Sequence, residues 1–340
     1  MYVTPEGKEV FIIDGHTHFW DGSPENQLNI HGKQFIDSFY GYHTFLSPKE
    51  QYWPKEKFEK YTEDDLYNDL FIDGPDDIAI VQSTYLKDFY KNGFNTIERN
   101  AEVAKRYPER FIVNGSFDPR DGEKALEYIH YMKENFNIQG VKMYTAEWNG
   151  SSRGWKLNDP QAYKCFELCE KLGIRNIHVH KGPTLRPLSL DAFDVHDVDY
   201  AASDFLNLNW IVEHCGLPRL EDFCWIATQE TNVYAGLAVA LPFIHNQPRY
   251  FAEIMSQLLL WLGPDKLLFG SDYAIWTPRW IVEEFWAFKM PEHLKKDPGV
   301  DLTDDDKCKI LGLNAARLYN IDIEAKKAVF AKSPLRIAAE

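Results

Sequence analysis

Two histidines near the start of the chain are spaced to bind a metal ion. Residues 11–19 read FIIDGHTHF, so three apolar β-forming residues lead directly towards His16 and His18. In a β-strand alternate side chains share a face, which places these two imidazoles on one side, about 6–7 Å apart along the strand. Each neutral ring offers a lone pair to zinc, iron or manganese. Because two histidines at this spacing also arise by chance, the prediction of a metal site depends on partners elsewhere in the chain.

Residues that suit the same site stand at the ends of other strand-like segments. They are Lys142, His180, His214 and Asp272. Three or four imidazoles with one carboxylate form a ligand set for a divalent ion such as zinc, iron or manganese. Lys142 cannot bind a metal as an ammonium, but as a carbamate it would act as a bridging carboxylate and hold two metals. Its alternative is an ammonium paired with Asp272 or with a substrate carboxylate.

These residues are carried by apolar segments that alternate with helical patterns. We expect strands over residues 11–19, 78–85, 111–117, 140–144, 176–181, 209–215, 233–241 and 267–274. We expect helices over residues 62–74, 92–107, 121–135, 159–172, 198–206, 217–229, 248–262, 279–288 and 303–319. Continuously apolar strands separated by helices indicate parallel pairing with both faces covered.

Eight such units favour an α/β fold of one kind, a single closed (β/α)8 TIM barrel. No GxGxxG follows the first strand, which argues against a dinucleotide-binding sheet. We expect residues 1–340 to form one domain, with function at the carboxyl ends of the barrel strands. All six candidate residues would then converge at the barrel mouth.

The segment 20–61 is an aromatic-rich insertion after the first strand. It is too aromatic to be disordered and too irregular for one helix, so we expect an ordered cover over the barrel mouth. Such a cover predicts a bulky, largely apolar substrate that is closed off from water.

Composition excludes several classes of partner. The formal net charge of −15 argues against nucleic acid and anionic membranes, because phosphates would be repelled. No run of 18 apolar residues is present, so we expect no membrane span. Five cysteines without a CxxC pair, and no signal peptide, indicate the cytoplasm. We expect a small-molecule substrate and a homodimer, with the tail 321–340 as a candidate exchange arm.

Several motifs together resemble a known family. They are IDGHTH at 13–18, GVKMY at 140–144, HVH at 178–180, EHCG at 213–216, FGSDY at 269–273 and LGLNAARLYNI at 311–321. The chain resembles the amidohydrolase superfamily, in the amidohydrolase-2 branch that includes aminocarboxymuconate-semialdehyde-decarboxylase-like enzymes. The match runs from the first strand to the last helix, with the insertion outside it.

The resemblance implies roles for the candidate residues. His16, His18, His180 and Asp272 match the family's metal ligands. His214 matches a histidine that handles a proton in members with one metal and binds the second metal in members with two. Lys142 departs from the decarboxylase pattern and is similar to the carbamylated lysine of dihydroorotase- and hydantoinase-type relatives.

Other polar residues near the strand ends have weaker claims on the site. His178 faces as His180 does but a layer deeper, so we interpret it as barrel packing, and Glu213 is expected on the outer face. Further candidates for the pocket, each with a surface or structural alternative, are Tyr144, Glu147, Trp148, His31, His43, Arg153, Arg186 and His196.

Three activities are compatible with this ligand set. The first is a metal-dependent hydrolase, in which Asp272 takes a proton from water and later delivers it to the leaving group. The second is a non-oxidative decarboxylase with one metal, in which Asp272 or His214 protonates the product. The third is a di-iron oxygenase on the same scaffold. A barrel that only binds a ligand is the non-enzymatic alternative.

Overall fold

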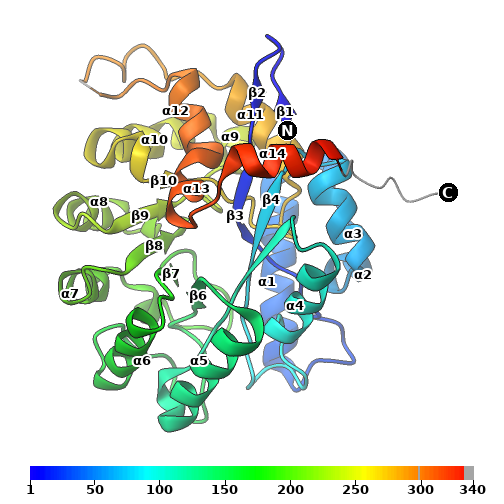
Figure 1. Ribbon diagram of the computed structural model, residues 1–340, viewed down its shortest axis with the longest axis vertical. Helices are drawn as coiled ribbons and strands as arrows, with labels where there is room; N and C mark the ends of the chain where they lie inside the picture. The colour runs from blue at the N-terminus through cyan, green and yellow to red at the C-terminus, as the bar shows by residue number, and fades with distance from the viewer. Residues whose placement is uncertain (298, 333–340) are drawn as a thin grey trace.

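Eight parallel strands form the centre of the molecule. The computed structural model describes residues 1–297 and 299–332, and Figure 1 shows helices arranged around these strands. The strands are β3 (Ile13–Thr17), β4 (Ile78–Gln82), β5 (Phe111–Asn114), β6 (Gly140–Met143), β7 (Asn176–His180), β8 (Asn209–Glu213), β9 (Val233–Gly236) and β10 (Leu267–Leu268). Every residue of β3, β4, β6 and β7 is buried, as continuously apolar parallel strands require.

The strands close into a ring. Regular pairing gives two sheets, β3-β4-β5 and β6-β7-β8-β9-β10. A parallel bridge between Gly115 and Val141 joins β5 to β6, and a second between Thr17 and Tyr273 joins β3 to the segment after β10. The amide of His18 donates to the carbonyl of Tyr273 at 2.6 Å across that second seam. The predicted (β/α)8 TIM barrel is therefore confirmed.

All eight strands end earlier than the predicted bounds, and two of them end five or six residues earlier. The segment 233–241 is extended only to Gly236, and 267–274 only to Leu268. Val239 has φ of 67° and Asp272 has φ of 58°, and a residue in the left-handed region cannot continue a strand. Both segments instead turn across the barrel mouth, which brings Asp272 towards the first strand.

Helices cover the outside of the barrel, as Figure 1 shows. They are α1 (Ile30–Leu46), α2 (Lys55–Glu59), α3 (Glu63–Tyr67), α4 (Ile97–Arg106), α5 (Glu123–Phe136), α6 (Pro160–Lys171), α7 (His196–Asp204), α8 (Leu220–Gln229), α9 (Phe243–Asn246), α10 (Pro248–Leu262), α11 (Pro278–Ala287), α12 (Asp304–Cys308), α13 (Asn314–Leu318) and α14 (Ile323–Lys332). A short antiparallel pair that the sequence did not predict, β1 (Tyr2–Val3) and β2 (Glu9–Val10), precedes the barrel.

The insertion contains one long helix, contrary to the expectation of an irregular segment. α1 spans 17 residues, beginning after Asn29, whose side chain accepts from the amide of His31. Phe35 and Phe39 lie four apart on its buried face, and the helix ends at Ser47 before a proline. Apolar burial on one face therefore outweighs the poor helix propensity of the aromatic residues.

The opposite end of the barrel is closed by the C-terminal helices. Ile13, Ile80 and Ile211 from three strands pack with Leu268 and Tyr319 in one apolar cluster. Beyond it, the ring of Phe330 on α14 stacks on Phe11 with 6.2 Å between centroids. The first part of the predicted exchange arm therefore packs on its own barrel, while residues 333–340 lie outside the described residues.

No helix in the described ranges is both long and apolar enough to cross a membrane. The single-domain organisation of residues 1–340 and the homodimer stay predictions.

Candidate metal centre

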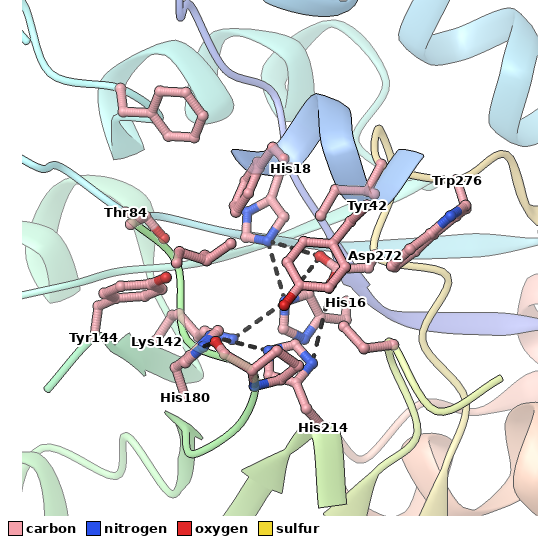
Figure 2. Close-up of a pocket in the computed structure, with 16 residues that line it drawn as sticks. His16, His18, Tyr42, Thr84, Lys142, Tyr144, His180, His214, Asp272 and Trp276 are labelled. Carbon is pink, nitrogen blue, oxygen red and sulfur yellow. Dashed lines mark hydrogen bonds and ion pairs between the residues drawn. The ribbon is translucent and has the colours of Figure 1, made fainter. Parts of the chain in front are cut away.

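Three of the predicted ligands meet at the barrel mouth. The Nε2 atoms of His16 and His18 lie 3.1 Å apart, and Oδ1 of Asp272 lies 3.6 Å from the first and 3.4 Å from the second. All three side chains are buried, and their ligand atoms lie within 4.8 Å of one another. Figure 2 shows them converging from β3 and from the segment after β10.

The polar contacts of the two β3 histidines leave their facing nitrogens as acceptors. Nδ1 of His18 lies 3.0 Å from the carbonyl oxygen of Gln82, which can only accept and so favours the proton on this nitrogen, and 3.0 Å from the side-chain amide nitrogen of Asn95. Nδ1 of His16 lies 2.8 Å from a carboxylate oxygen of Glu213, in an ion-pair contact without hydrogen-bond geometry, and this negative charge favours the proton on that nitrogen. Two lone pairs then face each other across 3.1 Å, an arrangement that a cation between them would stabilise. The residues therefore fit a divalent metal ion.

His180 and His214 form a second facing pair. Nδ1 of His214 lies 3.1 Å from the carbonyl oxygen of Ala238, and Nε2 of His180 lies 3.4 Å from that of Pro183. The remaining nitrogens, Nε2 of His214 and Nδ1 of His180, are 2.9 Å apart. By the same reasoning both are acceptors, so this pair also offers lone pairs to a cation.

Lys142 lies among these imidazoles. Its side chain is 1% exposed, and its Nζ lies 3.1 Å from Nε2 of His16. Among the described residues, no carboxylate oxygen lies within 4 Å of Nζ. Lys142 therefore forms no ion pair with Asp272 in this structure. Burial lowers the pKa of Lys142, against the opposing effect of the carboxylates of Glu213 and Asp272. A neutral amine is the form that reacts with carbon dioxide to give a carbamate.

Burial keeps His16, His180 and His214 neutral, and the neighbours of Asp272 keep it ionised. Burial lowers the pKa of His16 to about 3 and that of His214 to about 4. Burial alone would raise the pKa of Asp272, but the imidazoles of His16 and His18 lower it below its ordinary value. Neutral imidazoles beside a carboxylate are the protonation states that metal binding needs.

Asp14 fixes the two chain segments that carry the ligands. One of its carboxylate oxygens accepts from the amide of His16 and from the amide of Ser271, both at 3.0 Å. The amide of Asp272 in turn donates to the carbonyl of His16 at 3.0 Å. The relative position of His16 and Asp272 is therefore set by main-chain hydrogen bonds, which is the rigidity that a ligand pair needs.

Glu213 lies inside the barrel, so its predicted position on the outer face is wrong. Its side chain is buried between Nδ1 of His16 at 2.8 Å and Nδ1 of His178 at 2.6 Å. Strand alternation fails here because His214 has φ of 62°, which turns its side chain back towards the same interior. The neighbouring strand presents Gly236 at this level, where any Cβ would overlap the Glu213 carboxylate.

His178 lies a layer below the mouth, as the sequence predicted. Its Nδ1 faces Glu213, and its Nε2 lies 2.7 Å from the hydroxyl of Tyr319. That hydroxyl accepts from the side-chain amide of Asn114 at 2.7 Å. The network links the candidate ligand His16 through Glu213 to the closed end of the barrel.

A narrow apolar cavity opens onto the candidate ligands. It is lined by His16, His18, Phe39, Tyr42, Thr84, Phe94, Lys142, Tyr144, His180, Pro183, Leu185, His214, Val239, Asp272, Ile275 and Trp276. The cavity volume open to the centre of a water molecule is only about 30 Å³. A substrate of several atoms therefore enters only if side chains of the wall move.

Of the weaker candidates from the sequence, only some line the cavity. Tyr144 lines the cavity, whereas Glu147 and Trp148 do not. His43 is buried away from it: its Nδ1 bonds the carbonyl of Ile275 at 2.7 Å, and its Nε2 accepts from the amide of Trp53 at 2.9 Å.

The remaining candidates also lie elsewhere. Arg153 stacks over Trp148 with 3.4 Å to the ring centroid, and His196 pairs with Asp194 at the surface. Neither His31 nor Arg186 lines the cavity. Thr84 and Trp276, which do, had no sequence signal beyond their place after a strand.

Comparison with known proteins agrees with this architecture. A solved TIM-barrel protein of Bordetella bronchiseptica, Bb4693, which is uncharacterized, is 19% identical, with a TM-score of 0.69 over 94% of this chain and 100% of that one. A 2,6-dihydroxybenzoate decarboxylase from Rhizobium is 15% identical, with a TM-score of 0.63 over 92% and 100%. A probable 2-pyrone-4,6-dicarboxylic acid hydrolase from Acinetobacter baumannii is 13% identical, with a TM-score of 0.55 over 91% and 99%.

No curated protein matches the chain. The family model described as Amidohydrolase matches residues 13–321, which is most of the sequence. The chain therefore belongs to the amidohydrolase family.

Proposed function

We propose that this protein is a metal-dependent hydrolase that cleaves a carbonyl-type bond in a largely apolar small molecule. The observation that carries the proposal is the position of Lys142, a buried amine beside two pairs of imidazoles whose lone pairs face each other. A carbamate on this amine would supply the bridging carboxylate that two metal ions need.

The ligand set follows from the same geometry. His16, His18 and Asp272 would hold one ion, and His180 and His214 a second, with the Lys142 carbamate shared between them. Its formation joins the amine nitrogen to the carbon of carbon dioxide and releases one proton. Divalent metals, when bound, polarise a carbonyl oxygen and make water acidic enough to attack it near neutral pH.

Asp272 is suited to move the proton in this reaction. Its carboxylate is ionised and lies beside the ligand nitrogens of His16 and His18. As the oxygen of water bonds to the carbonyl carbon, Asp272 takes the proton that is lost. It then gives this proton to the leaving atom when the bond to the carbonyl carbon breaks.

Decarboxylation is the second candidate, and the structural neighbours favour it. A decarboxylase from Rhizobium and a manganese-bound 5-carboxyvanillate decarboxylase from Novosphingobium aromaticivorans share this fold. In that case Lys142 stays a free amine and takes up a proton to pair with the substrate carboxylate. The bond to carbon dioxide breaks and its electron pair stays on the substrate carbon. Asp272 or His214 takes up one proton from solvent and delivers it to that carbon.

Metal analysis of purified variants tests the proposal. His16→Ala and Asp272→Ala should lose metal while keeping the fold, which circular dichroism checks. His196→Ala, at an exposed site, is the matched control and should keep wild-type metal content. If either ligand variant keeps full metal content, its assignment is wrong.

The metal count also separates the candidates. Two zinc ions favour hydrolysis, and one zinc or manganese favours decarboxylation. Two irons with a visible absorption band would indicate the oxygenase, and a wild-type chain that takes up no metal would indicate a binding module.

A further inference from the structure

Two buried hydroxyl groups in the cavity have no partner within the protein. Tyr144 and Thr84 both line the cavity and are 5% and 3% exposed. Neither hydroxyl oxygen has a hydrogen-bond partner within residues 1–297 and 299–332. Figure 2 shows both residues on the same side of the histidine cluster. Because buried polar groups are nearly always paired in folded proteins, these two hydroxyls require an explanation.

Both hydroxyls are held in place by other parts of their residues. The backbone of Thr84 exchanges two hydrogen bonds with Asn95, at 2.8 and 2.9 Å. The ring of Tyr144 packs on His180 with 4.4 Å between centroids, and on Phe193 with 6.0 Å. The two groups are therefore fixed hydrogen-bonding positions.

The rest of the cavity wall carries no further charge. Apart from Lys142, Asp272 and the histidines, its lining side chains are aliphatic, aromatic or hydroxyl-bearing, and none of them is charged. A charged group at the far end of a substrate would have no counter-ion among them, and burying an unpaired charge is costly. A neutral oxygen, by contrast, can accept from a tyrosine or threonine hydroxyl.

We propose that the substrate carries an uncharged oxygen function, such as a ketone, hydroxyl or ether, that hydrogen-bonds to Tyr144 and Thr84. The rest of the molecule is apolar. This inference rests on the proposed function, which places the reacting bond at the histidines and so leaves the far end of the substrate to these hydroxyls. It makes Tyr144 and Thr84 specificity-determining residues.

Aryl hydroxamates provide the test, because the hydroxamate binds divalent metals and the ring extends from it. We would use benzohydroxamates and phenylacetohydroxamates with three para groups: acetyl, isopropyl and carboxylate. Acetyl and isopropyl have similar shape, but only acetyl offers an acceptor. Dissociation constants would be measured by calorimetry on the metal-loaded wild type, on the double variant Tyr144→Phe with Thr84→Val, and on Tyr131→Phe. Tyr131 is exposed on α5 and serves as the control.

In one of the two series, wild type should bind the acetyl probe about 3- to 10-fold more tightly than the isopropyl probe, the range for one net hydrogen bond. The carboxylate probe should bind weakest. The double variant should lose the acetyl preference and keep its affinity for the isopropyl probe, whereas Tyr131→Phe should match wild type. An acetyl preference that persists in the double variant, a carboxylate that binds best, or no binding by any probe to protein shown to hold metal overturns the inference.

The outcomes for metal and specificity are separable. A protein that holds metal without discriminating acetyl from isopropyl refutes only the specificity. A protein that discriminates them without metal refutes only the metal centre. Tyr144→Phe adds a measurement that needs no ligand: because it removes an unpaired buried hydroxyl, it should leave the melting temperature unchanged or raise it. A lower melting temperature would show that this hydroxyl has a structural partner, and would contradict its assignment to the substrate.

Discussion

Replacing Glu213 by glutamine should weaken metal binding without a metal ligand being changed. The carboxylate is buried, with one oxygen 2.8 Å from Nδ1 of His16 and the other 2.6 Å from Nδ1 of His178. An amide can accept with only one of its two ends, so its NH2 group must face one of these rings. Where it faces His16, the proton of that ring moves to Nε2 and the ligand lone pair is lost.

The size of the effect follows from what such partners contribute at other metal sites. Removing a partner that orients a metal-binding histidine lowers metal affinity about 10- to 100-fold, which corresponds to about 1.4–2.8 kcal/mol. We therefore expect the metal dissociation constant of Glu213→Gln to rise at least tenfold.

Competition with a chromophoric chelator measures this constant directly. Glu221→Gln, at an exposed position on α8, is the control and should bind metal as wild type does. Gly236→Ala tests the same carboxylate independently. Its methyl group would overlap the Glu213 oxygens and displace them, so this variant should also weaken metal binding. Wild-type affinity in a folded Glu213→Gln would falsify the role of this carboxylate in orienting His16.

Three further results are expected. Lys142→Met should hold at most one metal per chain by elemental analysis; two retained ions would exclude a bridging carbamate. His43→Phe should lower the free energy of unfolding in urea by about 1–3 kcal/mol, because it leaves the buried carbonyl of Ile275 and the part-buried amide of Trp53 without their partner. An unchanged value would show that water replaces the lost hydrogen bonds. In metal-free protein, His214 with its pKa lowered from 6.5 to about 4 stays neutral while the unfolded chain is protonated. The free energy of unfolding of wild type minus that of His214→Gln should therefore fall by up to about 1.4 kcal/mol per pH unit as the pH is lowered below 6.5. A difference that rises as the pH is lowered would contradict the lowered pKa of His214.

The barrel could be predicted because its strands are buried on both faces and bounded by helices. The pattern of apolar residues could not predict where each strand ends. The apolar runs through Val239 and towards Asp272 look like continued strands. Regular pairing nevertheless stops at Gly236 and Leu268, and the left-handed backbone at Val239 and Asp272 then turns the chain. The helix α1 was missed because its aromatic residues are poor helix formers, and the packing of Phe35 and Phe39 that stabilises it depends on tertiary structure.

The candidate site was predictable where the residue type carried the chemistry. His16, His18 and Asp272 meet, because strand ends of a parallel barrel converge at one mouth. Glu213 was misplaced because alternation assumes an extended neighbour, whereas His214 has a positive φ. Thr84 is recognised as a candidate only because its hydroxyl is buried without a hydrogen-bond partner, and no sequence pattern predicts that.

The metal content of the protein as purified, read together with the state of Lys142, tests the central claim most directly. Elemental analysis would count and identify the ions, and NMR after growth in isotopically labelled bicarbonate would detect a carbamate. The account predicts two divalent ions per chain and a carbamate signal that Lys142→Met abolishes. A wild-type chain that binds no divalent ion even when metal is supplied in excess would contradict it.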